Sequence, residues 1–124
     1  MNSNFCKISI LVCITVLLFG FTSCTEYQQV LKSKEPDLKY QKALTYFNDK
    51  QYVKAQTLLD EITSYYRGTD RSQDVLIYLS RSYMGQKDYI SAAEYFQAYI
   101  RNYPKGRYII EARFQVGHCY YLNA

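Results

Sequence analysis

The chain has 124 residues, enough for one small domain or for part of a larger protein. Its net charge of +4 is mild, and its Lys and Arg residues are scattered among Asp and Glu, so no nucleic-acid-binding stripe is expected. The chain has fifteen Tyr and no Trp. Most of these Tyr fall at helical spacing, which favours packing roles for them.

Residues 1–23 have the pattern of a bacterial lipoprotein signal peptide. Lys7 is their only charged residue, and an apolar run at 8–21 follows it. This run is shorter than the roughly 20 residues of a transmembrane helix and suits the apolar region of a secretory signal. Small residues then precede Cys24, as in a lipobox, although Phe21 stands where Leu is usual.

Cys24 is therefore predicted to become the lipidated first residue of the mature chain. The alternative is an ordinary secretory signal followed by an incidental cysteine. Cys6 and Cys13 lie in the removed segment, so a lipidated Cys24 leaves Cys119 without a disulfide partner. Residues 24–35 are polar and are predicted to tether the lipid to the first helix.

Residues 36–124 alternate apolar segments of helical period with short polar turns. Pro36 and Asp37 suit the first turn of a helix, because Pro is tolerated there and Asp meets the positive end of the dipole. The pattern predicts an all-α fold with helices at about 36–47, 52–66, 72–84, 89–103 and from 107 to the C-terminus.

The helices form a repeat with a period of 37 residues. This distance separates Tyr46 from Tyr83, Tyr52 from Tyr89 and Ala55 from Ala92. The segment 76–104 also matches the tetratricopeptide pattern, with these residues at its marked positions: Leu76, Leu79, Ser80, Tyr83, Ala92, Phe96 and Pro104.

This match predicts tetratricopeptide hairpins stacked as an α-solenoid of about two and a half repeats. The repeats are 36–68, 72–106 and a partial one at 107–124. Repeat arrays usually end in a polar cap, whereas the last helix here is rich in apolar residues. We therefore expect the sequence to be truncated at its C-terminus.

The sequence offers no catalytic constellation. His118 is its only histidine, which excludes a multi-histidine metal site. Adjacent helical residues point about 100° apart, so His118 and Cys119 do not form a catalytic pair, and a packed cysteine beside a groove-lining histidine is favoured. No glycine-rich phosphate loop is present. We expect a binding module without enzymatic activity, cofactor or metal.

In tetratricopeptide arrays the first helix of each repeat lines a concave groove. The corresponding positions mix aromatic, aliphatic and charged side chains, as a peptide-binding groove should. They are Asp37, Tyr40, Leu44, Phe47 and Asn48 in repeat one, Asp74, Ile77, Arg81 and Met84 in repeat two, and Glu111, Phe114, His118 and Tyr121 in the half repeat. The alternative is that Leu44, Ile77 and Phe114 simply pack helix against helix.

A lipobox followed directly by such repeats resembles the BamD-type (YfiO) family of outer membrane assembly lipoproteins. The resembling parts are 21–24, 40–66, 72–104 and 112–121. Among them, 96–104 looks like the aromatic-x-x-Tyr-Pro ending of the family's repeats. Family members are longer, so the resemblance implies that this chain is an N-terminal half.

The resemblance also implies a function in the β-barrel assembly machinery. The chain would be anchored to the bilayer through Cys24, on the periplasmic face of the bacterial outer membrane. Its implied partners are the barrel-forming protein with periplasmic repeat domains and nascent outer membrane proteins. Two rivals stay open: a periplasmic tetratricopeptide lipoprotein that scaffolds cell-wall enzymes, and an enzyme whose catalytic domain follows Ala124.

Overall fold

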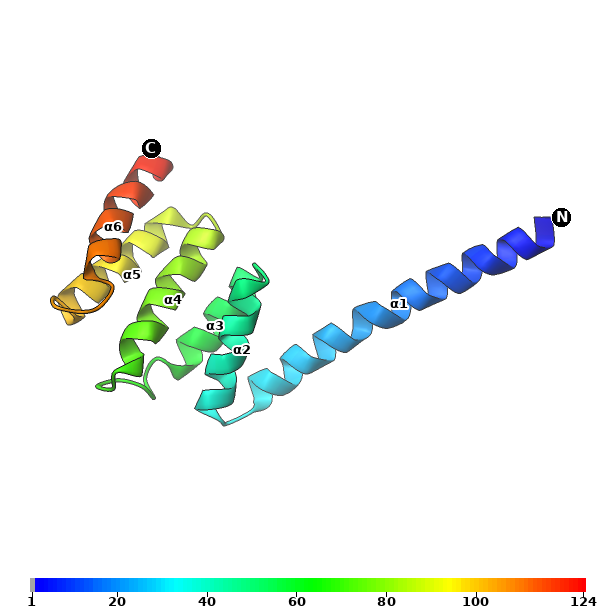
Figure 1. Ribbon diagram of the computed structural model, residues 1–124, viewed down its shortest axis with the longest axis horizontal. Helices are drawn as coiled ribbons and strands as arrows, with labels where there is room; N and C mark the ends of the chain where they lie inside the picture. Colours follow the sequence, from blue (N-terminus) through cyan, green and yellow to red (C-terminus); the bar gives the residue numbers. More distant parts are fainter. Residues whose placement is uncertain (1) are drawn as a thin grey trace. The chain divides into compact units, whose positions relative to one another are not determined.

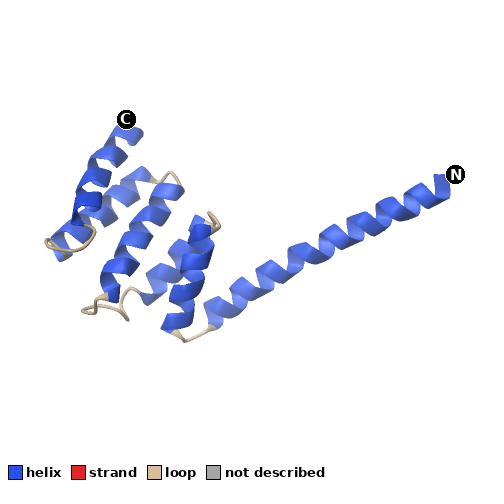
Figure 2. Cartoon of the chain, in the orientation of Figure 1, coloured by secondary structure: helices blue, strands red, loops and turns tan. Residues whose placement is uncertain are grey.

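The computed structural model describes residues 2–124, apart from the side chains of residues 16–23. The chain divides into two compact units, residues 1–33 and residues 34–124. Helices joined by short loops and turns make up the described residues, and no strand occurs among them (Figure 1, Figure 2).

The first unit is a single helix, α1 (Asn2–Lys32), which contains the apolar run. Within the part of the chain that the structure describes, no helix is long and apolar enough to cross a membrane. Residues 24–32, predicted from their polarity to be a tether, continue this helix. Their Glu, Gln, Leu and Lys residues have good helix propensity, so a polar composition did not prevent a helix.

The second unit is a series of helical hairpins. Each helix packs against the next one along the chain, and α2 also contacts α4 (Figure 1). The order of elements is α2 (Pro36–Asn48), α3 (Tyr52–Ile62), α4 (Arg71–Gly85), α5 (Tyr89–Asn102) and α6 (Ile109–Asn123). This sequential packing confirms the all-α fold of stacked tetratricopeptide-type hairpins.

The two hairpin turns have the same backbone geometry. Lys50 and Lys87, 37 residues apart, both adopt the left-handed conformation, with φ of 60° and 62°. In the first turn the N–H of Lys50 bonds to the carbonyl of Phe47, and the N–H of Gln51 bonds to that of Tyr46. The second turn repeats both bonds. This pair of bonds is a Schellman motif, which closes the C-terminus of a helix.

One helix is shorter than the sequence predicts. We expected the second helix of repeat one to reach Tyr66, but α3 ends at Ile62 and turns occupy 63–68. Thr63 and Ser64 follow that end, and such residues compete for backbone hydrogen bonds and favour turns. Gly68, with φ of 80°, then supplies the left-handed step before α4.

The core contains the small and the large residues that the repeat pattern marks, packed together. Ala92 and Phe96 of α5 are fully buried, as are Ile77 of α4 and Tyr99 of α5. In α6, by contrast, the only buried residues are Ala112 and Cys119. Burying a side chain such as Phe96 contributes about 1.5–3 kcal/mol, so α4 and α5 supply more of the stability than α6 does.

Candidate binding face

The first helices of the repeats, α2, α4 and α6, carry a continuous set of half-buried side chains. Aromatic rings, one arginine and two carboxylates lie on it. We call this surface the first-helix face and define it by Leu44, Phe47, Asp74, Tyr78, Arg81, Glu111 and His118.

The groove residues predicted from the sequence fall into three groups. Half-buried side chains, which combine a fixed position with some exposure, are Leu44, Phe47, Asp74, Arg81, Met84, Glu111 and His118. Exposed ones are Asp37, Asn48, Phe114 and Tyr121. Tyr40 and Ile77 are buried, at 8% and 0% exposure. Ile77 therefore packs between helices in this structure, which is the alternative that the sequence left open for it.

Contacts between α2 and α4 form the first junction of the repeats. The guanidinium of Arg71 donates to the carboxylate of Asp37 across 2.6 Å. The hydroxyl of Tyr66 donates to the same carboxylate. Arg71 also lies over the rings of Tyr40 and Tyr66, 4.9 and 5.3 Å from their centroids. Burial, and then the bond to Asp37, raise the pKa of Tyr66.

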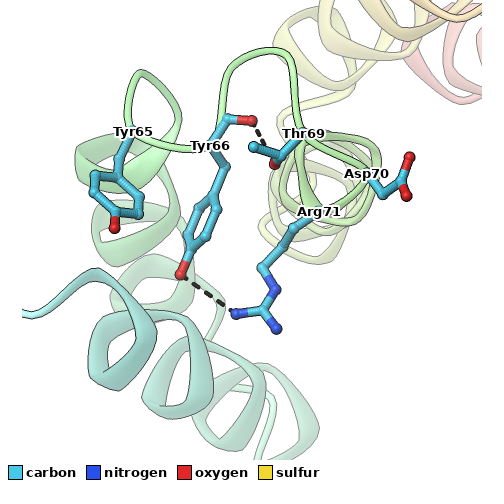
Figure 3. A pocket seen from close by; sticks show the side chains of 5 residues that line it. All are labelled: Tyr65, Tyr66, Thr69, Asp70 and Arg71. Atoms are coloured by element: carbon cyan, nitrogen blue, oxygen red, sulfur yellow. Dashed lines mark hydrogen bonds between the residues drawn. The ribbon is translucent and has the colours of Figure 1, made fainter.

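An open pocket of about 540 Å³ lies beside this junction (Figure 3). It is lined by Tyr65, Tyr66, Thr69, Asp70 and Arg71. In Figure 3 the hydroxyl of Tyr66 and the guanidinium of Arg71 meet on one side, while Asp70 points away. The Tyr65 ring is 65% exposed, so an aromatic surface borders the pocket.

Contacts between α4 and α6 form the second junction. Arg81 makes a bidentate (two-pronged) interaction with Glu111, in which Nε donates to Oε1 at 2.7 Å and Nη2 donates to Oε2 at 2.6 Å. The same guanidinium lies over the rings of Tyr78 and Tyr108, 5.0 and 5.4 Å from their centroids. The bond to Glu111 raises the pKa of Arg81. Two-pronged bonds fix orientation as well as charge, so Arg81 is held rigidly.

Asp74 is the second acceptor of this junction. The hydroxyl of Tyr108 donates to it across 2.7 Å, and a nitrogen of Arg107 lies 3.6 Å away. Burial, followed by this hydrogen bond to a carboxylate, raises the pKa of Tyr108 to about 12. Its phenol is therefore neutral, and remains a donor, at physiological pH.

Behind these residues the second junction is filled by a polar network. The hydroxyl of Tyr99 donates to Oε1 of Gln73 at 2.8 Å and accepts from the backbone N–H of Tyr108 at 3.0 Å. The backbone N–H of Arg107 donates to the same Gln73 oxygen. A Cβ on Gly106 would lie 2.4 Å from the Tyr99 hydroxyl, so this position requires glycine.

An aromatic cluster covers the turn end of the face. The ring of Phe47 meets Tyr52 and Tyr78 edge to face, with centroids 5.4 and 5.2 Å apart. A Cβ on Gly85 would overlap the Tyr52 ring at 2.5 Å, so α4 approaches α3 closely at this glycine. Such edge-to-face pairs contribute about 0.5–1.5 kcal/mol each beyond their buried area.

The α6 part of the face is the least enclosed. The rings of Phe114 and His118 lie 5.6 Å apart, and Nδ1 of His118 lies 3.2 Å from Gln115 Oε1. Cys119 instead points to the core, where its sulfur contacts that of Met84 at 3.3 Å. Burial raises the pKa of Cys119, as is typical of an unreactive structural thiol. His118, by contrast, is half-buried on the first-helix face. Over the residues that the structure describes, no group of three ligands could hold a metal ion.

Sequence reasoning missed several residues that shape this face: Tyr66, Arg71, Tyr78, Arg107 and Tyr108. Tyr78 lies one turn from Asp74 and Arg81, so helical spacing alone could have found it. Arg71 and Arg107 contact acids in the preceding first helix, at a distance in sequence that only the packing of repeats reveals.

A search of curated proteins gives no match to the sequence. A family model described as YfiO, outer membrane lipoprotein, matches residues 32–123. The chain belongs to this family. The matched residues include all of α2–α6, so the first-helix face lies within the part of the chain shared with the YfiO family. Cys24 lies outside the matched residues, and its lipidation stays a prediction.

Proposed function

We propose that the protein is a non-enzymatic lipoprotein subunit of the outer membrane β-barrel assembly machinery. It binds the barrel-forming component, unfolded outer membrane protein segments, or both, on its first-helix face. Membership of the YfiO family carries this proposal. The face supports it because its aromatic rings and arginines are positioned by their own neighbours before any partner arrives.

Binding on this face makes or breaks no covalent bond. Phe47 and Tyr78 offer aromatic surface, and Arg81 offers donors beside them. Large, well-fixed aromatic and arginine side chains carry most of the binding energy in protein interfaces. Because Arg81 is already paired with Glu111, the middle of the face adds no net charge. The main attraction for a partner segment is therefore its apolar side chains.

The N-terminal part of the proposal is a lipid anchor. Residues 1–23 act as the signal peptide, Cys24 carries the acyl chains, and residues 24–35 connect them to the repeats at 36–124. Each buried CH₂ group of an acyl chain contributes about 0.8 kcal/mol, and two or three chains anchor a protein stably where one does not. The anchor holds the face at the periplasmic side of the outer membrane.

The test is a pull-down of the complete protein from detergent-solubilised outer membrane, with captured proteins identified by mass spectrometry. We expect a barrel protein with periplasmic repeat domains. Recovery of cell-wall hydrolases or synthases in its place would contradict the proposal and favour the scaffold for cell-wall enzymes.

A pair of variants connects the captured partner to the face. Phe47→Ala removes an aromatic ring from the first-helix face and should reduce recovery about tenfold or more, as for an interface hot spot. Val53→Ala removes an apolar side chain, 61% exposed, from the second helix of the same repeat and should leave recovery unchanged. Equal recovery of the partner by both variants would place its binding site elsewhere.

A further inference from the structure

The two ends of the helical hairpins differ in charge. Two connections, α3 to α4 and α5 to α6, lie at one end of the second unit, and the hairpin turns lie at the other (Figure 1). We call residues 63–73 and 101–108 the loop edge, and residues 48–52 and 85–89 the turn edge. The loop edge has five Lys or Arg and one Asp, whereas the turn edge has two Lys and two Asp.

Contacts between the two connections hold the loop edge together. The hydroxyl of Tyr103 donates to that of Ser72 at 2.6 Å, and the side chain of Arg107 donates to the backbone carbonyl of Asp70 at 3.2 Å. These bonds bring cations that are 30 or more residues apart in sequence onto one surface. The positive charge is therefore concentrated only in the folded unit, because Lys and Arg are scattered along the sequence.

Three of the five cations are not neutralised. Arg71 and Arg107 pair with acids of the first helices. Arg67, Arg101 and Lys105 are exposed, and in the described chain none of them forms an ion pair. An exposed cation without an acid can neutralise a charge on a partner at little desolvation cost.

A pocket of about 150 Å³ opens on this edge between the two connections. It is lined by Thr63, Arg67, Ser72, Leu76, Asn102 and Tyr103. The hydroxyls of Thr63, Ser72 and Tyr103 already donate to acceptors within the protein. The guanidinium of Arg67 and the amide of Asn102 are the groups around this small hollow that can donate to phosphate oxygens. Tyr65, 65% exposed, follows Thr63 on the same edge and adds an amphipathic ring of the kind enriched at membrane interfaces.

We infer that the loop edge binds the phosphate headgroups of anionic phospholipids at the membrane surface. The inference rests on the membrane anchoring in the proposed function, which keeps the repeats within reach of a bilayer. A lipid surface suits these cations because Arg67, Arg101 and Lys105 spread along an edge of loops that also carries the exposed ring of Tyr65. Basic residues near an anionic leaflet each contribute about fivefold to its binding.

The experiment uses the complete protein, purified from membranes and reconstituted into phosphatidylethanolamine vesicles with or without phosphatidylglycerol. Hydrogen exchange is measured over the loop edge and the turn edge. We expect slower exchange at 63–73 and 101–108 in the anionic vesicles, and loss of this protection at 1 M salt, where the Debye length falls to about 3 Å. Flotation with the vesicles reports separately whether the anchor is present.

Two double variants with the same change in charge sharpen the result. Arg67→Gln with Lys105→Gln should reduce the equilibrium constant for binding of the loop edge to the anionic bilayer about thirtyfold. Lys50→Gln with Lys87→Gln removes the same charge from the turn edge and should change nothing. Equal exchange in both kinds of vesicle, for a protein that floats, would overturn the inference. So would protection of the loop edge only after an acidic partner protein is added.

Discussion

The two junctions between repeats occupy equivalent positions but are built differently. At the second junction, Tyr99 fills the interior and its hydroxyl joins Gln73 to the backbone of the next loop. The residue 37 positions before Tyr99 is Ile62, which is buried but has no hydroxyl to offer. The first junction instead relies on Arg71 and Asp37, whose side chains are 41% and 79% exposed, beside an open pocket.

The comparison shows that one repeat pattern can build both a rigid junction and a weaker, more open one. The second junction has satisfied polar groups at depth, which make a junction rigid and specific. An exposed ion pair such as Arg71–Asp37 contributes only about 0–1 kcal/mol. The first junction is therefore the weaker of the two, and it leaves aromatic surface free at the pocket.

The largest loss of stability should come from replacing Tyr99 of the second junction with isoleucine, the residue at the equivalent position of the first junction. Tyr99→Ile removes a buried ring and leaves the N–H of Tyr108 without its acceptor, so we expect a loss of about 3 kcal/mol in the free energy of unfolding. Tyr99→Phe, which keeps the ring, should lose about 1–2 kcal/mol. Urea unfolding followed by tyrosine fluorescence measures both, because Tyr27 is the only Tyr outside the second unit. An equal loss in the two variants would show that the hydroxyl alone matters.

A matched pair of glycine substitutions should act in opposite directions. Gly106→Ala places a Cβ against the buried Tyr99 and should destabilise the protein by about 1–3 kcal/mol. Gly117→Ala in α6 meets nothing within 4 Å and should stabilise it by about 0.5–1 kcal/mol through helix propensity. Thermal unfolding of the two variants checks this. An unchanged stability of the Gly106→Ala protein would mean that the packing of the second junction adjusts to an added methyl group and is no more rigid than that of the first.

The two arginines should differ in the same direction as their junctions. Arg81→Gln leaves the half-buried Glu111 without its two-pronged partner and should cost about 1–2 kcal/mol. Arg71→Gln removes an exposed pair and should cost less than about 1 kcal/mol. Unfolding at low and high salt tests the assignment, because screening should reduce the Arg71 effect more. A larger loss for Arg71→Gln would reverse the ranking of the junctions.

The smallest expected effect is a fall in the free energy of unfolding at alkaline pH. The pKa of Tyr108 is about 12 in the folded chain, above its ordinary value near 10, chiefly because of burial and then Asp74. Between these two values the unfolded chain loses the proton first, so stability is complete below pH 10 and falls as the pH rises towards 12. Tyr108→Phe should flatten part of this fall in urea titrations. An unchanged pH profile would show that Tyr108 does not carry it.

Much of the fold follows from the sequence, because its signals are local and repeated. Ala92, Phe96 and the 37-residue period predicted the helices, their order and their packing. The end of α3 was placed too late, since Thr63 and Ser64 have a general preference for turns that the apolar pattern does not reveal. Ile77 was ambiguous because one helical position can face either the groove or the core.

The junctions themselves could not be predicted in the same way. The contacts of Arg81 with Glu111 and of Tyr108 with Asp74 join residues at least 30 positions apart. Their partners depend on the rotation between successive hairpins, and no spacing along one helix encodes that rotation. The regular positions of Asp37, Asp74 and Glu111, 37 residues apart, were the available signal for these acceptors.

That row of acids has a consequence for building new proteins. Each acid occupies the first turn of a first helix, and each receives an arginine from the adjacent first helix or the connection that leads into it. Tandem copies of residues 72–108 would therefore reproduce the contacts of Asp74 with Arg107 and Tyr108 at every junction. Among the contacts of the acids, one would change: an aspartate, from the copy of Asp74, would stand where Arg81 now meets Glu111. This 37-residue segment is thus a modular unit from which longer synthetic arrays could be assembled.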